Sequence, residues 1–406
     1  MRKILQIQWV FLIGLLAMAA CDSPRSQNKK SYVVVVSLDG FRWDYAEKSK
    51  TPTLDSIEKY GVKAKSLKPS FPTKTFPNHY ALATGLYPDH HGIVQNTFYD
   101  PELDAEYMIR DREAVENPDF YQGEPIWVTA EKQGVPTASY FWVGSEAPIQ
   151  GIQPSIWKEY QHNFPFEQRI DSVVAWLQLP EEKRPQLIML YFHEPDHVGH
   201  AYGPDSPETA DMVGHLDSLM GVLSKKLNEL PVAKNINLII LSDHGMGNVS
   251  PDRSIVFDQQ VDTAWFDKIM GHNPNLLLKV KKEFYDTAWK ALQQIPHLTA
   301  WKHGQVPERL HYGTNPRTLD FIVVADSSWS ISFSYDPVSY HGAHGYDNDN
   351  PDMHAIFYAT GPDFKSGYDA PTFENVDIYP LLAKLLKIEP ANVDGDLEIT
   401  GTFIKK

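Results

Sequence analysis

The chain has 406 residues, one cysteine, a formal charge of −15 and a hydrophobic content of 42%. Its 20 tyrosines, 19 phenylalanines and 10 tryptophans exclude a disordered chain, and its length excludes a small disulfide-stapled scaffold. The length favours two units, or one large α/β domain with an insertion. A protein that binds a nucleic-acid duplex needs a basic surface, so the acidic balance argues against that partner.

The first 20 residues have the pattern of a signal peptide. Arg2 and Lys3 precede an apolar run that ends at Ala20 and is too short to span a bilayer comfortably, which takes about 20 residues. Cys21 follows directly and resembles the lipidated cysteine of a bacterial lipoprotein; the alternative is an ordinary signal peptide and a free thiol. We therefore predict an exported protein, periplasmic or on the cell surface, anchored to a bacterial membrane only through lipid on Cys21, with residues 21–30 as a flexible tether.

Three short apolar runs predict strands, and each is followed by residues that can perform chemistry. The runs are residues 33–38, 187–192 and 236–241. Runs of this length bounded by breakers are typical of buried parallel strands. An aspartate follows each run, at Asp39, Asp196 and Asp243. Because ligands bind beyond the carboxyl ends of such strands, we expect these carboxylates to meet.

Helical patterns between the runs predict an α/β fold, with a mostly parallel central sheet flanked by helices on both faces. One pattern covers residues 165–177, and another begins at Ser206 and carries apolar residues at helical spacing, namely Val213, Leu216, Met220, Leu223 and Leu227. We assign residues 31–250 and 336–406 to this catalytic domain. Residues 251–335 break the rhythm, with a helical stretch at 282–292 and a return strand at 321–325, and are predicted to be a capping insertion.

Side chains suited to two-metal hydrolysis accompany the strand ends. Such hydrolysis needs oxygen and nitrogen ligands around two cations about 4 Å apart, and the candidates are Asp39, Asp196, His200, Asp243, His244 and His344. Asp196 and His200 would share one face of a helix whose first residue is Pro195. A single aspartate after a strand is more often a turn former, but three beside histidines favour a metal site. The ligand types favour zinc and also suit manganese.

Residues 193–197 match the H-E-x-x-H pattern of zinc proteases. That pattern requires both histidines on one continuous helix, and Pro195 at its centre would break the helix. We therefore expect His193 and His197 to line or flank the site without binding metal.

Thr75 is the candidate nucleophile. It precedes a helix expected to begin near Pro77, where free N–H groups and the helix dipole favour a phosphate. A threonine hydroxyl needs activation by a metal or a base. The alternative is that Thr75 only caps the helix.

Six motifs together resemble the nucleotide pyrophosphatase/phosphodiesterase family of the alkaline phosphatase superfamily. They are DGFR (39–42), TKTFPNHY (73–80), TGLYP (84–88), EPD with GH (194–196 and 199–200), SDHGM (242–246) and HGYDN (344–348). They occur in the order that the family has, and the resemblance extends from Tyr32 to the C-terminus. It implies an alkaline-phosphatase-like fold and two zinc ions per chain.

The resemblance also implies roles for single residues. One zinc would be held by Asp39, Thr75, Asp243 and His244, and the other by Asp196, His200 and His344. Thr75 would form a covalent nucleotidyl intermediate, and Asn96 would bind the oxyanion. A neutral amide suits the single charge of a diester, whereas a monoesterase typically adds an arginine fork. His91 would be structural, and Asp347 and Asn348 would support His344.

The resemblance implies a nucleotide pocket formed by Phe76, Trp142, Glu146, Tyr160 and Tyr191. Glu146 stands where nucleotide-hydrolysing members often carry aspartate, and Val115 occupies the approximate place of a lysine found in some members. The expected reaction is zinc-dependent hydrolysis of nucleotide phosphodiester and pyrophosphate bonds to nucleoside 5′-monophosphates, by a monomer acting on small nucleotides.

Three other functions are possible from the residues. A phosphodiesterase acting on lipid headgroups such as glycerophosphocholine or lysophospholipid would use the same metals. A phosphomonoesterase or mutase would fit the superfamily but not Asn96 and Thr75. A solute-binding lipoprotein would need a pocket but no nucleophile beside two metals.

Overall fold

The computed structural model describes residues 30–405, and residues 31–406 form one unit. The predicted signal peptide, the lipidation of Cys21 and nearly all of the tether lie outside the described residues. In the described part of the chain, no helix is both long and apolar enough to cross a membrane.

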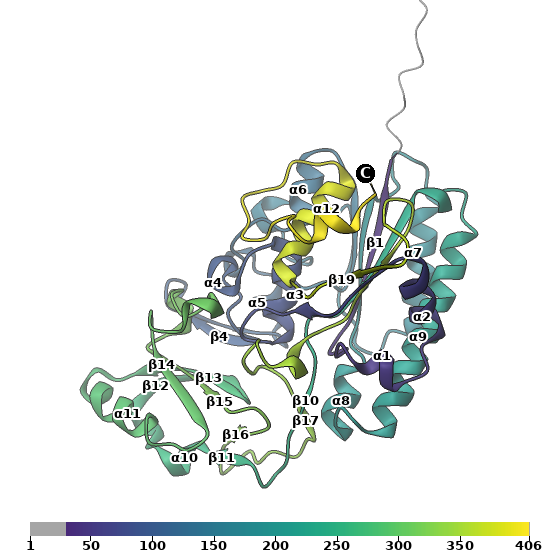
Figure 1. Cartoon of the computed structure of the whole chain (residues 1–406). Helices are drawn as coiled ribbons and strands as arrows, with labels where there is room; N and C mark the ends of the chain where they lie inside the picture. Colours follow the sequence, from purple (N-terminus) through teal and green to yellow (C-terminus); the bar gives the residue numbers. More distant parts are fainter. Residues whose placement is uncertain (1–29, 406) are drawn as a thin grey trace, which may run out of the picture. The chain divides into compact units, whose positions relative to one another are not determined.

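An eight-stranded sheet forms the centre of the unit, and seven of its strands run in one direction (Figure 1). Its strand order is β19 (Tyr368–Ala370), β2 (Val62–Ala64), β18 (Phe357–Thr360), β9 (Ile236–Leu241), β1 (Tyr32–Leu38), β8 (Leu187–Phe192), β6 (Thr137–Tyr140) and β7 (Ile156–Lys158). Only β18 is antiparallel to its neighbours β9 and β2. The prediction of a mostly parallel sheet is therefore confirmed, and the three predicted runs are its central strands β9, β1 and β8.

Helices cover both faces of this sheet, because alternate residues of β1 are apolar on both sides. Val33 and Val35 join the core beneath α3 (Thr75–Thr84), α6 (Ile126–Lys132) and α12 (Ile378–Leu386). Val34 and Val36 join a second core beneath α2 (Pro52–Tyr60), α7 (Phe166–Leu177) and α9 (Pro207–Asn228). The two groups of helices lie on opposite sides of β1 in Figure 1.

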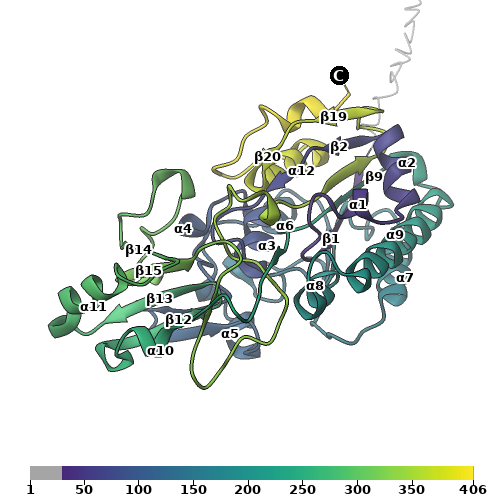
Figure 2. The same cartoon turned by 60° about the horizontal axis from the view of Figure 1, so that its bottom comes forward.

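A second sheet lies within residues 251–335 (Figure 2). It is antiparallel, in the order β12 (Phe266–His272), β13 (Asn275–Val280), β15 (Phe321–Ala325) and β14 (Leu298–Lys302). Leu276 and Leu278 face α11 (Tyr285–Leu292), whereas Leu277 joins the core that contains α3. The small sheet is thus packed against the main core along one face.

Shorter elements connect these layers. Hairpin β4–β5 (Thr97–Asp100, Ala105–Met108) contacts β12, and helix α8 (Asp196–Tyr202) follows β8. The other short helices are α1 (Tyr45–Lys48), α4 (Pro88–His91), α5 (Arg112–Glu116) and α10 (Phe257–Gln260). The other short strand pairs are β3 (Leu67–Lys68) with β20 (Phe373–Glu374), β10 (Gly247–Asn248) with β17 (Gly342–Ala343), and β11 (Ser254–Val256) with β16 (Ser330–Ser332).

Ser206 caps α9, as its sequence pattern predicts: its hydroxyl accepts a hydrogen bond of 3.1 Å from the Thr209 amide. Substituting Ser206→Ala leaves that amide unpaired and should cost about 1 kcal/mol of stability. Ser218→Ala is the control, because Ser218 lies on the exposed side of the middle of α9, where alanine is the better helix former. Denaturant unfolding should place Ser206→Ala below the wild type and Ser218→Ala at or above it; equal midpoints for the two variants would contradict the assignment.

Candidate active site

The carboxyl ends of β8, β1 and β9 bring the predicted aspartates together. Asp39 follows β1, and its amide donates to the Phe192 carbonyl at the end of β8 (3.0 Å). Its own carbonyl accepts from the amide of Asp196 (2.9 Å). Gly40 has φ +69°, and a Cβ atom there would lie 2.9 Å from the Asp196 backbone. Only glycine leaves room for the two strand ends to approach this closely.

The first cluster consists of Asp39, Asp243 and His244, whose ligand atoms all lie within 4.8 Å of one another. His244 Nε2 is 3.1 Å from Asp243 Oδ2 and 3.5 Å from Asp39 Oδ1. The Thr75 hydroxyl is 3.3 Å from the same His244 nitrogen. The four residues to which the resemblance assigns one metal are therefore neighbours in space.

The second cluster consists of Asp196, His200 and His344, again within 4.8 Å of one another. Asp196 Oδ1 lies 3.5 Å from Nε2 of both histidines. Asp196 and His200 share a face of α8, as predicted, although the helix begins at Asp196 and Pro195 is its N-cap. The rings of His344 and His244 stack with centroids 3.6 Å apart, so the two clusters are adjacent.

Each histidine of the clusters is oriented by a backbone carbonyl. Nδ1 of His244 donates to Gly245 (2.8 Å), that of His200 to Gly342 (2.7 Å), and that of His344 to Thr73 (2.8 Å). Because Nδ1 carries the proton in each case, Nε2 faces the site with a free lone pair, the form in which histidine binds metals.

The expected support of His344 by Asp347 and Asn348 is wrong. Asp347 pairs instead with Arg309, and the Asn348 amide donates to the Pro69 carbonyl (3.0 Å). The Nδ1 proton of His344 goes instead to the carbonyl of Thr73, so His344 is oriented by the backbone and not by these two side chains.

Within the described residues, three buried carboxylate oxygens of the site accept no hydrogen bond: Asp39 Oδ1, Asp196 Oδ1 and Asp243 Oδ2. The companion oxygens of the two deepest carboxylates do have donors. The Tyr191 hydroxyl donates to Asp39 Oδ2 (2.6 Å), and the Gly40 amide to Asp243 Oδ1 (3.2 Å). The unpaired oxygens are the ones that face the histidine nitrogens, and buried oxygens without donors are costly unless a cation satisfies them.

Repulsion between the carboxylates also indicates that this site is suited to bind cations. Burial, together with the negative charges of Asp243 and Asp196, raises the pKa of Asp39 well above its usual value. Burial also acts to raise the pKa of Asp243, but His244 and His79 outweigh it and hold that pKa well below its usual range. Carboxylates this close cannot all be ionised cheaply without added positive charge. Imidazole nitrogens and carboxylate oxygens around two adjacent points therefore fit a pair of divalent cations such as zinc.

Thr75 is the first residue of α3, and Lys74 is its N-cap, so the helix begins two residues earlier than the sequence predicts. His79 lies one turn further along α3 and is fully buried. Its Nδ1 is 2.9 Å from the Thr75 carbonyl and 3.2 Å from Asp243 Oδ2, and its Nε2 is 2.8 Å from the Ser37 hydroxyl. Sequence reasoning missed this bridge between helix and metal cluster, although the four-residue spacing from Thr75 could have indicated it.

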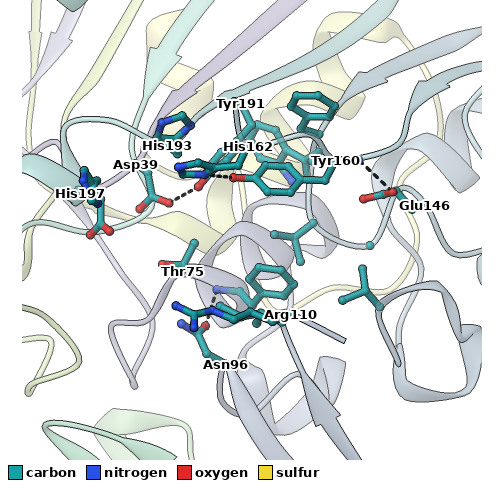
Figure 3. A pocket seen from close by; sticks show the side chains of 18 of the residues that line it. Asp39, Thr75, Asn96, Arg110, Glu146, Tyr160, His162, Tyr191, His193 and His197 are labelled. Atoms are coloured by element: carbon teal, nitrogen blue, oxygen red, sulfur yellow. Dashed lines mark hydrogen bonds between the residues drawn. The ribbon is translucent and has the colours of Figure 1, made fainter. Parts of the chain in front are cut away.

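A cavity of about 660 Å³ opens beside Thr75 (Figure 3), a size typical of small-molecule sites. It contains every predicted substrate residue, together with Asn96 and members of both metal clusters. His193 and His197 also line it, as expected, and none of its lining residues comes from 251–335. The lining residues are Asp39, Thr75, Phe76, Asn96, Ile109, Arg110, Arg112, Val115, Phe141, Trp142, Val143, Gly144, Glu146, Tyr160, His162, Tyr191, His193, Asp196, His197, His200 and His344.

Two predicted substrate residues are engaged within the protein. Trp142 is 1% exposed, and its indole N–H donates to the His79 carbonyl (3.0 Å). Glu146 pairs with Arg112 and accepts from the Tyr160 amide (3.2 Å). These contacts hold the pocket wall, and Arg112 was not identified from the sequence.

Three further residues around the cavity were also missed. Arg110 lies beside Asn96 and points toward the cavity (Figure 3). His162 accepts or donates a 3.0 Å hydrogen bond with the Tyr160 hydroxyl. Lys74 is buried behind Thr75, where burial lowers its pKa to about 7 against the opposing charge of Asp196. Nothing in the local sequence distinguishes Arg110 and His162 from ordinary surface residues, whereas Lys74 lies within the TKTFPNHY motif.

The Asn96 side chain faces the start of α3. Its Oδ1 accepts from the Phe76 amide (2.9 Å), which fixes the plane of the side-chain amide beside Thr75. With Oδ1 occupied, Nδ2 is the donor that this side chain can offer to a bound oxyanion.

Solved structures share this fold. The structure of an inactive threonine-to-alanine variant of murine ectonucleotide pyrophosphatase/phosphodiesterase 5 in complex with AMP superposes with a TM-score of 0.89 at 34% identity, covering 93% of this chain and 100% of that one. The human protein of the same name gives a TM-score of 0.88 at 36% identity, covering 92% and 100%. The alkaline-phosphatase-like α/β fold is thereby confirmed.

Sequence comparison agrees. The chain is 37% identical over 376 residues to human ectonucleotide pyrophosphatase/phosphodiesterase family member 1, covering 89% of this chain and 40% of that protein. It is 38% identical over 380 residues to the venom phosphodiesterase CdcPDE of Crotalus durissus collilineatus, covering 90% and 46%. The chain thus spans less than half the length of these curated relatives. The Type I phosphodiesterase / nucleotide pyrophosphatase family profile matches residues 33–347, and the chain belongs to that family.

Asp39→Asn should have opposite effects on stability with and without metal. In chelator-treated protein the substitution removes a buried, repelled carboxylate, so the melting temperature should rise above that of the wild type. Zinc should stabilise the wild type, by about 2.7 kcal/mol at a hundredfold excess over Kd, and the variant much less. Thermal unfolding in chelator and in zinc measures both effects.

Asp211→Asn is the matched control, since Asp211 is exposed on α9. It should leave both the chelator and the zinc melting temperatures unchanged. A chelator-treated Asp39→Asn protein less stable than chelator-treated wild type would contradict the repulsion.

Proposed function

We propose that this protein is a zinc-dependent phosphodiesterase that hydrolyses nucleotide phosphodiester and pyrophosphate bonds through a covalent intermediate on Thr75 and releases nucleoside 5′-monophosphates. The observation that carries the proposal is the position of the Thr75 hydroxyl, at the start of a helix and 3.3 Å from His244, beside two adjacent carboxylate–histidine clusters. Family membership and the AMP complex of the murine relative support it.

The chain's own residues would perform the following steps. The Thr75 oxygen attacks phosphorus, its proton is lost to solvent, and the bond from phosphorus to the leaving oxygen breaks. Water then attacks the nucleotidyl-Thr75 ester, which releases the 5′-monophosphate and restores the hydroxyl. Two zinc ions held by Asp39, Thr75, Asp243 and His244, and by Asp196, His200 and His344, would supply Lewis acidity to these steps.

Preference for diesters over monoesters follows from Asn96. A diester carries one negative charge on its non-bridging oxygens, and a single amide donor from Nδ2 suits it. The adjacent end of α3 contributes the positive end of the helix dipole. His79 contacts both the Thr75 carbonyl and the Asp243 carboxylate, and it thereby holds Thr75 beside the first metal cluster.

The aromatic side of the cavity would receive the nucleoside. Phe76 and Tyr160 both line the cavity, and Tyr160 is anchored at both ends, by Glu146 at its amide and by His162 at its hydroxyl. An anchored ring loses little entropy when a base stacks on it. The rest of this subsite is formed by side chains that line the cavity around these two rings, namely Trp142, Glu146 and Tyr191.

We further propose that the protein is exported and held at a bacterial membrane, periplasmic or on the cell surface, through lipid on Cys21 alone. The support is the signal-like sequence of residues 1–20 and the position of the only cysteine. The protein would act as a monomer. Its substrates would be small nucleotides, since its charge of −15 disfavours binding of a nucleic-acid duplex.

The test of the function is hydrolysis of p-nitrophenyl thymidine monophosphate against p-nitrophenyl phosphate, on protein lacking residues 1–21. Thr75→Ala should lower kcat on the diester by at least about 10³-fold, because the attacking oxygen is gone. Thr75→Ser keeps a hydroxyl and should retain measurable turnover.

Two further arms complete that test. AMP should bind Thr75→Ala with nearly the wild-type affinity, and chelation should silence the wild type until zinc is returned. Equal turnover by Thr75→Ala would exclude the threonine intermediate. Rapid hydrolysis of glycerophosphocholine with dinucleotides left intact would favour the lipid-headgroup function instead.

Tyr160→Ala should raise KM for the nucleotide diester by roughly 5- to 150-fold, corresponding to loss of about 1–3 kcal/mol of base stacking. Hydrolysis of bis(p-nitrophenyl) phosphate, which has no nucleobase, should change far less. Tyr60→Ala is the control, since Tyr60 is an exposed tyrosine on α2. Equal losses on both substrates would mean that Tyr160 maintains the fold of the pocket and binds no base.

A further inference from the structure

A buried pair of amide side chains connects the loop after His344 with Asn96 and does not line the cavity. Asn275, the first residue of β13, is 2% exposed, and Gln95, beside Asn96, is 1% exposed. Neither belongs to the metal clusters or to the cavity wall. Burying two amides is costly unless each donor and acceptor has a partner, so their contacts indicate what they do.

These contacts form one continuous path. Asn275 Nδ2 donates to the Gly345 carbonyl (2.6 Å), and Asn275 Oδ1 accepts from Gln95 Nε2. Gln95 Oε1 then accepts from the backbone amide of Asn96 (2.9 Å). Gly345 follows the metal-cluster residue His344, so the path runs from one metal cluster to the proposed oxyanion donor.

The turn that carries Asn275 also packs directly against Gly345 and against Lys74, the residue before Thr75. Gly345 has φ +114°, and a Cβ atom there would lie 2.9 Å from Pro274 Cδ and 2.5 Å from Lys74 Cε. The Lys74 ammonium, next to Thr75, donates to the Asn273 carbonyl (2.5 Å). Residues 273–275 therefore touch the chain immediately before Thr75 and immediately after His344.

We propose that Asn275 and Gln95 are positioning residues that set the separation between His344 and Asn96, and that the small four-stranded sheet contributes to catalysis through this bridge. The inference rests on the proposed function for the roles of His344 and Asn96. An amide is planar and accepts and donates along fixed directions, so it transmits position better than apolar packing does. Loss of such a supporting partner typically costs about 10- to 100-fold in metal affinity or activity.

The experiment compares Asn275→Ala and Gln95→Ala with the wild type in two assays. The first is the rate at which a chelator removes zinc from the loaded protein, and the second is kcat and KM for p-nitrophenyl thymidine monophosphate. Asn275→Ala frees the His344 loop and should speed zinc release about 10- to 100-fold. Gln95→Ala frees Asn96 and should lower kcat about tenfold or more, with KM and zinc release unchanged. The double variant should lose less kcat than the product of the single losses.

Asn275→Asp covers the case in which Asn275→Ala does not fold. Its carboxylate still accepts from Gln95 but offers no donor to the Gly345 carbonyl. Zinc release should therefore rise while kcat falls less than in Gln95→Ala.

Asn237→Ala is the matched control. Asn237 is an equally buried amide at the opposite end of β9, where it donates to Ser31 and Asp363. It should lower the melting temperature and leave zinc release and kcat unchanged. If Asn275→Ala behaves like Asn237→Ala, Asn275 only stabilises the fold and the proposal is overturned.

The two proposals fail separately. A wild-type protein that does not hydrolyse the diester refutes the proposed function, while the comparison of zinc release still decides the role of Asn275. An active wild type with unchanged zinc release in Asn275→Ala refutes only the bridge.

Discussion

The meeting of Asp39, Asp196 and Asp243 at the ends of three adjacent parallel strands is the constraint on which the site depends. Parallel strands deliver their carboxyl ends to one edge, and the order β9, β1, β8 makes the three ends neighbours. Burial then leaves three carboxylate oxygens without donors, in a place where their charges repel. Divalent cations would relieve that repulsion, and the histidines around the carboxylates are oriented so that they could bind such cations as well.

The orientation of the histidines depends on backbone atoms rather than on other side chains. His200, His244 and His344 each give the Nδ1 proton to a main-chain carbonyl. Carbonyls of strands and tight loops are held by the fold itself, so the histidine nitrogens that face the two clusters are placed with little freedom. The small sheet reaches this region through residues 273–275, which contact the loop after His344 and the residue before Thr75.

The pocket combines an apolar wall with a few anchored polar groups. Tyr160 is held by Glu146 and His162, and Glu146 in turn is held by Arg112. Glu146 therefore links two neighbours of the pocket wall, Tyr160 and Arg112.

The sequence by itself determined the three central strands of the sheet, the metal-cluster residues and the position of Thr75. Apolar runs that end in aspartate are local signals, and the strand and helix periods that surround them are also local. The tertiary structure alone decided which carbonyl orients each histidine, why Asp347 serves Arg309 and not His344, and how His79, Gln95, Lys74 and Asn275 enter the site. The decisive long-range contacts, such as His344 with the Thr73 carbonyl and Asn275 with the Gly345 carbonyl, join residues about 70 to 270 positions apart, and their partners are backbone atoms that carry no sequence pattern. Such pairings depend on packing, because a side chain's partner is set by what the folded chain brings within 3 Å of it.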